Sequence, residues 1–459
     1  PKSDKETGGA VMGAVMEMYR SKRITAEKAA AMIQSHSVVD YFAFSVSSRY
    51  LDAALAKRAG ELEDVTIRSE IRVAPPFATF MADPEGKTFR LESLFWGPIE
   101  LMVPPERRSY TPARVSEFER LFVANDISSD FASFMVSPPD DEGYLYFCPS
   151  PSLALMDARN AKCFFAEINE NLFPIPGSEE RRIHISEVDY VIEGDNPALM
   201  PLPRAKPTPI AGAIAQHIVG ELFDGACLQV GYGEIPDAVA ELIIQSDLKD
   251  LGIHTEFLGD GVMNLYKTGK ITGAYKQLQP GKITAGIAFG SQEFYEFMRE
   301  CPDLYMTTSS YTNNSAVIAQ NDNVIGINAF LDINLSGDVN AESVGGNTLS
   351  GTGGQLDFVI GSQWSKNGKS IMCGPSTYVR KDGVRVSRVV GTFPAGTSVT
   401  TPRSCMHYVC TEYGIVNLRG RNLCERAELL ISIAHPDFRD GLILEAQQMG
   451  LWRPRNRRG

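Results

Sequence analysis

Short β-rich runs alternate with amphipathic helical patterns along almost the whole of this 459-residue sequence. Residues 25–33 are typical of a helix, because Thr25 is a favourable N-cap and Glu27 falls in the first turn. Residues 163–168 form an apolar run of the length of a buried strand. Strands that alternate with helices predict a mostly parallel sheet covered by helices. We therefore expect an α/β fold.

A proline-dense segment interrupts this pattern near the middle of the chain. Such density ends regular structure and stiffens a linker. After it the alternation restarts, with a helical pattern over 210–223 and an apolar run over 227–230. We predict two open α/β domains, residues 1–200 and 210–459, with a cleft between them. The prolines of the segment 196–209 are Pro197, Pro201, Pro203, Pro207 and Pro209.

Charge and composition exclude several classes of function. The formal net charge of −12 argues against a general nucleic-acid binder, although the tail from Trp452 to Gly459 is basic and is expected to be solvated. No apolar stretch approaches the roughly 18 residues of a membrane helix, and the first residues lack an apolar signal core. The eight cysteines form no C-x-x-C pair, which favours reduced thiols in a cytoplasmic protein. The histidines lack metal-ligand spacing, so we predict no metal site.

The stretch 251–261 combines an apolar run with one carboxylate and a glycine turn. If the run is a strand, His254 and Glu256 share one face of it, and ligands of open α/β sheets bind at the carboxyl ends of strands. Glu256 is then a candidate nucleophile for acyl chemistry. On composition alone, a strand-end glutamate is more often a cap or a partner in an ion pair.

Two further glycine turns frame this glutamate. The turn Gly231-Tyr232-Gly233 follows a strand and opens a helix, but it lacks the third glycine of a dinucleotide fingerprint, so it is weak evidence for a dehydrogenase. It either lets the backbone pass or offers N–H groups to a ligand. The turn 351–354 holds three glycines and is either an oxyanion hole or a flexible hairpin tip. The segment 332–337 mimics a calcium loop but lacks its closing glutamate, so we discount calcium.

Several ordered blocks extend this pattern over much of the chain. They lie at 228–239, 254–256, 260–261, 328–329, 351–358, 365–369, 399–403, 411–414 and 434–439, with thinner ones at 136–140 and 166–169. Together they resemble the acetyl-CoA hydrolase/transferase family, which includes 4-hydroxybutyrate and butyryl-CoA:acetate CoA-transferases. The likeness is strongest over residues 205–445. It departs at Glu234, which stands where that family's turn usually has a glycine, and at Gly259, where a serine is common.

The resemblance implies two domains of the NagB/RpiA/CoA-transferase-like type, with the active site in the interdomain cleft. The N-terminal domain is a CoA-transferase α/β domain, and the C-terminal acetyl-CoA hydrolase/transferase domain carries the catalytic glutamate. That glutamate is Glu256, with Gly353 and Gly354 beside the reacting carbonyl. The implied CoA contacts are Val230, Gly231, Tyr232, Gly233, Glu234, Leu331, Gly351, Gly354 and Lys369.

The resemblance further implies a cytoplasmic CoA-transferase that works through a glutamyl-CoA thioester. Acyl-CoA is its substrate, and no tightly bound cofactor is expected. The acceptor is a short-chain acid, either 4-hydroxybutyrate or a C4/C5 dicarboxylate such as succinate or itaconate. A hydrolase that uses the same glutamate, and a catalytically silent CoA-binding protein, are the alternatives. We expect a homodimer or higher homo-oligomer, with no nucleic-acid or membrane partner.

Overall fold

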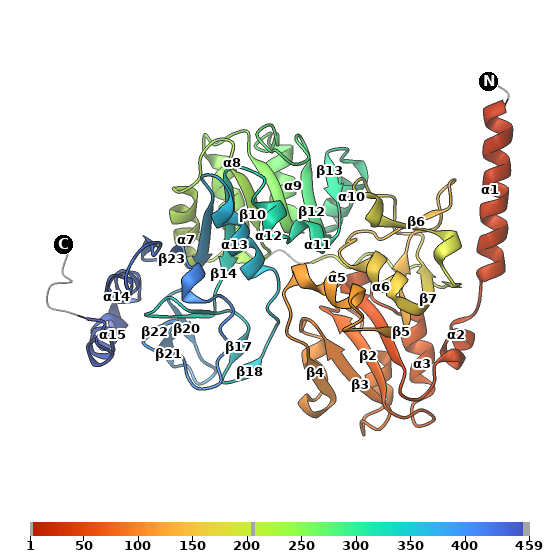
Figure 1. Cartoon of the computed structure of the whole chain (residues 1–459), viewed down its shortest axis with the longest axis horizontal. Coiled ribbons are helices and arrows are strands. Elements are labelled where there is room, and N and C mark those ends of the chain that lie inside the picture. The colour runs from red at the N-terminus through yellow and green to blue at the C-terminus, as the bar shows by residue number, and fades with distance from the viewer. Residues whose placement is uncertain (1–2, 203–206, 453–459) are drawn as a thin grey trace. The chain divides into compact units, whose positions relative to one another are not determined.

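A computed structural model describes residues 3–202 and 207–452 of the chain (Figure 1). The remainder of the predicted linker, residues 203–206, and residues 453–459 of the basic tail lie outside the described residues. Helices and strands alternate along the chain, which confirms the predicted α/β class. The chain divides into two compact units: residues 1–202 with 286–310, and residues 203–285 with 311–459.

The first unit is built on a seven-stranded sheet in the order β4-β3-β2-β1-β5-β7-β9. Neighbouring strands pair in parallel, because helices or long loops connect them. Thr25 caps α2 by accepting a hydrogen bond from the N–H of Lys28, as its sequence position predicts. The elements of residues 1–202 are α1 (Ser3–Lys22), α2 (Ala26–Met32), β1 (Val38–Ala43), α3 (Tyr50–Ala56), β2 (Val65–Glu70), α4 (Ala78–Ala82), β3 (Phe89–Ser93), β4 (Arg108–Tyr110), α5 (Val115–Val123), β5 (Ser129–Val136), β6 (Tyr144–Tyr146), α6 (Ala154–Asn160), β7 (Ala161–Ile168), β8 (Arg182–His184) and β9 (Tyr190–Glu193).

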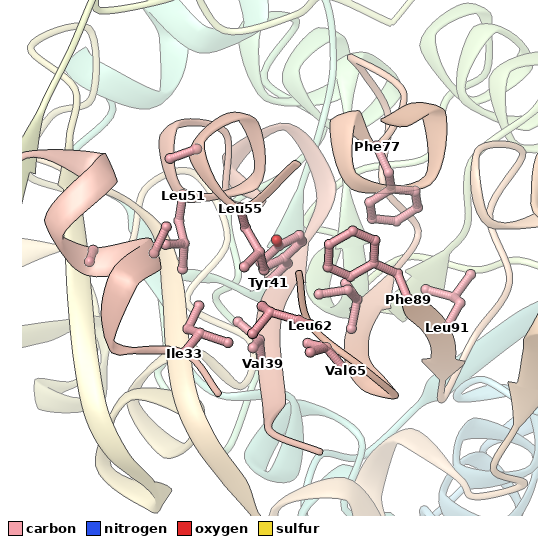
Figure 2. Close-up of a cluster of buried hydrophobic side chains, with 14 of the residues drawn as sticks. Ile33, Val39, Tyr41, Leu51, Leu55, Leu62, Val65, Phe77, Phe89 and Leu91 are labelled. Atoms are coloured by element: carbon pink, nitrogen blue, oxygen red, sulfur yellow. The ribbon is translucent and has the colours of Figure 1, made fainter. Parts of the chain in front are cut away.

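A hydrophobic core holds α3 against this sheet. Figure 2 shows Val39 of β1, Val65 of β2 and Phe89 of β3 grouped with Leu51 and Leu55 of α3. The exposed fractions of these five side chains are all 0%, so each contributes close to the full free energy of burial, roughly 1.5–3 kcal/mol. The core therefore fixes α3 against β1, β2 and β3 of the sheet.

The segment 286–310 packs with the first unit although it lies far along the chain. It carries the end of β12 (Ile283–Ala288), α10 (Gln292–Glu300) and β13 (Leu304–Met306). The hydroxyl of Ser150 donates to the carbonyl of Ala288 over 3.1 Å, and the Ser152 and Ser309 hydroxyls are 2.7 Å apart. The first unit is thus assembled from two separate stretches of sequence.

The second unit contains the strand order β11-β10-β14-β19-β23-β24. The pairs from β11 to β23 are parallel, and β24 is antiparallel to β23. β10 is the first strand of this order in the chain. β11 lies on one side of it and β14 on the other, so the border between β10 and β14 is a topological switch point. The elements are α7 (Pro209–Val219), β10 (Cys227–Val230), α8 (Glu234–Gln245), β11 (Gly252–Leu258), α9 (Asp260–Lys267), α11 (Ser309–Thr312), α12 (Ser315–Ile318), β14 (Val324–Ala329), β15 (Asp332–Asn334), β16 (Val339–Asn340), β17 (Ser343–Val344), β18 (Asn347–Thr348), α13 (Gln355–Trp364), β19 (Lys369–Cys373), β20 (Thr377–Val379), β21 (Arg385–Ser387), β22 (Val389–Val390), β23 (Tyr408–Thr411), β24 (Gly414–Asn417), α14 (Leu423–Ser432) and α15 (Pro436–Gln448).

Two further observations concern the helices and the cysteines. Within residues 3–202 and 207–452, no helix has both the length and the apolar character needed to cross a bilayer. The eight cysteines are all free thiols, and those at 148, 227, 301, 373 and 410 are buried. Free, mostly buried thiols are the arrangement that their sequence spacing predicts.

Candidate functional site

The carboxyl ends of four parallel strands meet at one edge of the second unit's sheet. Residues from or just beyond the ends of β10, β11, β14 and β19 line a cavity of about 440 Å³ there. This is the edge at which open α/β sheets bind ligands, and the cavity lies at the switch point between β10 and β14. Its lining includes Gln229, Gly231, Glu256, Asn328, Gly354 and Cys373.

The first glycine turn forms one wall of the cavity. β10 ends at Val230, and Gly233 adopts a φ of 127°, a conformation that side-chain-bearing residues rarely take. α8 then begins at Glu234, so the turn passes directly into the first helical residue. The hydroxyl of Thr255 donates to the carbonyl of Val230 over 3.1 Å, which ties this turn to the strand that carries Glu256.

Glu256 lies on β11 with its carboxylate at the cavity. Its side chain is half-buried, and the amide nitrogen of Asn313 donates a hydrogen bond to Oε2. Burial raises the pKa of Glu256 to about 7, the charge of Asp357 acts in the same direction, and the hydrogen bond from Asn313 opposes both. A carboxylate with one side-chain donor and a raised pKa is a stronger base and nucleophile than an exposed carboxylate.

The second glycine turn opens a helix instead of forming a hairpin tip. Gly353 has a φ of 59°, Gly354 is the N-cap of α13, and the helix begins at Gln355. A methyl group added to Gly354 would overlap the Glu256 carboxylate and the Asn313 amide. Glycine at this position therefore lets the N-terminus of α13 approach Glu256 closely.

The structure brings most of the sequence-predicted site residues together. Glu256 and Gly354 line the cavity with Gly231, Tyr232, Gly233 and Glu234. Val230, Gly351 and Gly353 flank these residues in the chain and do not line the cavity. Leu331 lines a different hollow, and Lys369 pairs with Glu221 over 2.7 Å at the amino end of β19, opposite the cavity edge. CoA contacts at Leu331 and Lys369 remain predictions of the resemblance alone.

Four polar residues of the site were not predicted as site residues from the sequence. Gln229 and Asn328 lie in otherwise apolar strands, where a lone polar residue was a usable signal, and the Asn328 amide donates to Gln229 Oε1 over 3.1 Å. Gln355 donates to the carbonyl of Ala329 over 2.7 Å. Asn313 gave no signal, because its contact with Glu256 joins residues far apart in the sequence.

The charge of the cavity is negative. Glu234 and Glu256 are the charged residues of the lining, and no Lys, Arg or His is among the described residues that line it. In the described parts of the chain, no group of three or more His, Cys, Asp or Glu side chains could hold a metal ion. The cavity lining thus contains side-chain amides and carboxylates and no basic side chain among the described residues.

Comparisons with known proteins give a consistent picture. Residues 12–202 match the family described as acetyl-CoA hydrolase/transferase N-terminal domain, and residues 290–446 match its C-terminal domain. The chain is 39% identical to the butyryl-CoA:acetate CoA-transferase of Anaerostipes caccae, over 96% of this chain and 99% of that protein. It is 38% identical to the 4-hydroxybutyrate coenzyme A transferase of Clostridium kluyveri, over 94% and 98%. The crystal structure of RipA from Yersinia pestis superposes with a TM-score of 0.86 at 34% identity, covering 95% of this chain and 99% of that one.

Proposed function

This chain belongs to the acetyl-CoA hydrolase/transferase family and is a CoA-transferase, and we propose that it carries CoA from an acyl-CoA to a short-chain carboxylic acid through a covalent glutamyl-CoA thioester at Glu256. Acyl-CoA and the free acid are its substrates. No resident cofactor takes part in this scheme.

The observation that carries the proposal is the position of the Glu256 carboxylate. It faces a cavity of about 440 Å³, and burial raises its pKa to about 7. Carboxylate is a weak nucleophile in water, so removing it from water and binding the remote parts of CoA both help the attack.

In the first half-reaction the Glu256 carboxylate attacks the acyl carbonyl and expels CoA as a thiolate, which leaves a mixed anhydride. The thiolate then attacks the glutamyl carbonyl of that anhydride. This step releases the first acid and leaves the Glu256-CoA thioester. In the second half-reaction the acceptor carboxylate attacks the thioester, CoA departs again, and its thiolate attacks the acceptor's carbonyl. The products are the new acyl-CoA and the free Glu256 carboxylate.

Each of these steps passes through a tetrahedral oxyanion that needs hydrogen-bond donors. The backbone around Gly353 and Gly354 and the amide of Asn313 supply donors beside Glu256. One such donor is worth roughly 2.7–4 kcal/mol to the transition state. In this scheme the turn 231–234 holds CoA, with Val230 and Gly351 supporting the two turns.

The lining of the cavity favours an acceptor with an uncharged tail. A second carboxylate on the acceptor would meet Glu234 and find no cation in the described lining, whereas a hydroxyl group could pair with the amides of Gln229 and Asn328. We therefore favour 4-hydroxybutyrate over succinate or itaconate as the acceptor.

Trapping of the covalent intermediate tests the proposal. Incubation with acyl-CoA, followed by borohydride and peptide mass spectrometry, should locate a reduced glutamyl thioester at Glu256. The acceptors butyrate, 4-hydroxybutyrate and succinate are then compared at equal concentration. Full transferase activity in Glu256→Gln would refute the mechanism. Release of CoA at the same rate without any acceptor would identify the enzyme as a hydrolase.

A further inference from the structure

His254 lies two residues before Glu256 on β11 and is completely buried. Its Nε2–H donates to the carbonyl of Thr312 over 2.9 Å. The next residue, Asn313, donates its amide to Glu256. The hydroxyl of Thr312 donates to Oδ1 of Asn313 over 2.9 Å, which turns the amide nitrogen of Asn313 toward the carboxylate. A short chain of hydrogen bonds therefore runs from His254 to the oxygen of Glu256.

The partner on the other side of the ring fixes the tautomer of His254. The Oδ1 atom of Asn321 accepts the backbone N–H groups of Gln277 and Leu278 over 3.1 and 2.9 Å, so the amide nitrogen of Asn321 must face the ring. That nitrogen lies 3.5 Å from Nδ1 of His254, which has to accept and cannot carry a proton. The imidazole is thus a neutral ring with its single proton on Nε2.

The charges around His254 keep it neutral. Burial lowers the pKa of His254 to about 4, the ammonium of Lys276 acts in the same direction, and the Thr312 carbonyl opposes them. Lys276 is buried, and it donates to the carbonyls of Ile253 and Lys282 and to the hydroxyl of Thr284. The rings of Tyr311 and Phe358 lie 6.2 and 6.5 Å away. A ring enclosed in this way is unsuited to shuttling protons and suited to holding a fixed position.

We propose that His254 is a positioning residue for the transfer reaction: it holds the Thr312 carbonyl and thereby keeps the Asn313 amide on Glu256. This inference rests on the proposed role of Glu256 as nucleophile. The side-chain amide of Asn313 orients the Glu256 carboxylate through a single hydrogen bond. A small displacement of the backbone at residues 312–313 therefore removes that hydrogen bond. A misplacement of about 1 Å near reacting atoms can cost ~100-fold in rate.

Two substitutions separate the roles of the two ring nitrogens. The amide nitrogen of glutamine reaches the region of Nε2 and can still donate to Thr312, whereas the shorter asparagine reaches only the level of Nδ1. His254→Gln should keep kcat within about 5-fold of the wild type, and His254→Asn should lose about 30–100-fold with little change in KM for acyl-CoA. His407→Asn is the matched control, because His407 is also buried and neutral but contacts the N–H of Ser370 instead.

The pH profile gives a readout that a purely structural role would not move. The hydrogen bond from Asn313 lowers the pKa of Glu256, so losing it should shift the acid limb of kcat to higher pH in His254→Asn and leave it in place in His254→Gln. Thermal unfolding of each variant is recorded, and His254→Leu replaces His254→Asn if the latter does not fold.

A double-mutant cycle with Asn313→Ala decides the case. If His254 acts through Asn313, His254→Asn/Asn313→Ala loses no more activity than the more damaged single variant. Losses that multiply, or equal losses in the glutamine and asparagine variants, would overturn the inference. Failure of the proposed function itself would look different, because the wild type would then form no thioester at Glu256.

Discussion

Two glutamates on parallel strands, one in each unit, have opposite surroundings. Glu167 on β7 is fully buried and accepts from the hydroxyls of Ser48 and Ser133 and from the N–H groups of Arg49, Tyr50 and Leu51, all within 2.7–3.0 Å. Those N–H groups form the start of α3, where a carboxylate is favoured. Glu256 on β11 has a side-chain hydrogen bond from Asn313 and faces a cavity.

The comparison separates a structural carboxylate from a reactive one. Five donors satisfy the charge of Glu167 and fix the position of α3, so this residue stabilises the fold. Burial with little compensation leaves the charge of Glu256 high in energy, and attack on an acyl group relieves that cost. The number of donors around a buried carboxylate therefore tells its role better than its position on a strand does.

Neutralising each glutamate in turn tests whether their roles differ. Glu256→Gln should lower the acyl-exchange rate by about 10⁴-fold or more, because the nucleophile is gone, and leave the fold intact. Glu167→Gln should place an amide N–H₂ against the donors and lower the free energy of unfolding by ~2–4 kcal/mol, with the folded enzyme active. Urea titrations and exchange assays on both variants measure this; similar activity losses would refute the distinction.

A second change tests the close approach of α13 to Glu256. Gly354→Ala should lower kcat by about 100-fold or more, because its methyl group overlaps Glu256 and Asn313. The matched control is Gly441→Ala in α15, where an added methyl group meets nothing within 4 Å and should raise the free energy of unfolding by ~0.5–1 kcal/mol. An active Gly354→Ala enzyme would place the reacting carboxylate elsewhere.

The raised pKa of Glu256 gives the reaction and the stability of the fold a pH signature. Because the carboxylate is the reacting form, kcat/KM for acyl-CoA should fall about 10-fold per unit below pH 7. Because the folded pKa exceeds the unfolded one, the folded state holds the extra proton. The stabilisation of the folded state by this proton is present at low pH and is lost as the pH rises through about 7. Urea melts of the wild type should show this slope, and melts of Glu256→Gln should lack it.

A milder substitution concerns the donors around Glu167. Ser133→Ala removes one of five hydrogen bonds and should lower the free energy of unfolding by ~1–2 kcal/mol, with kcat within about 2-fold of the wild type. A larger change in kcat than in stability would show that Glu167 also serves the reaction.

Local patterns predicted much of the fold and part of the site. The cap at Thr25, the strand ending at Val230 and the glycine turn after it depend on neighbours within a few residues, so the sequence reveals them. Asn313 could not be found in this way, since its role depends on a tertiary contact across 57 residues. The glycines of the turn 351–354 are evident in the sequence, but the function of the turn is not. Only the packed structure places Gly354 against Glu256.

The return of residues 286–310 to the first unit has a consequence for synthesis on the ribosome. The linker after residue 202 suggests that the first unit could fold as soon as it emerges, but its partners for Ser150, Ser152 and Met200 are not yet translated. At roughly 5–20 residues per second, the missing segment follows about 5–20 s later. During that interval the nascent first unit lacks Gly286–Ser310 and the hydrogen bonds that this segment makes with Ser150, Ser152 and Met200.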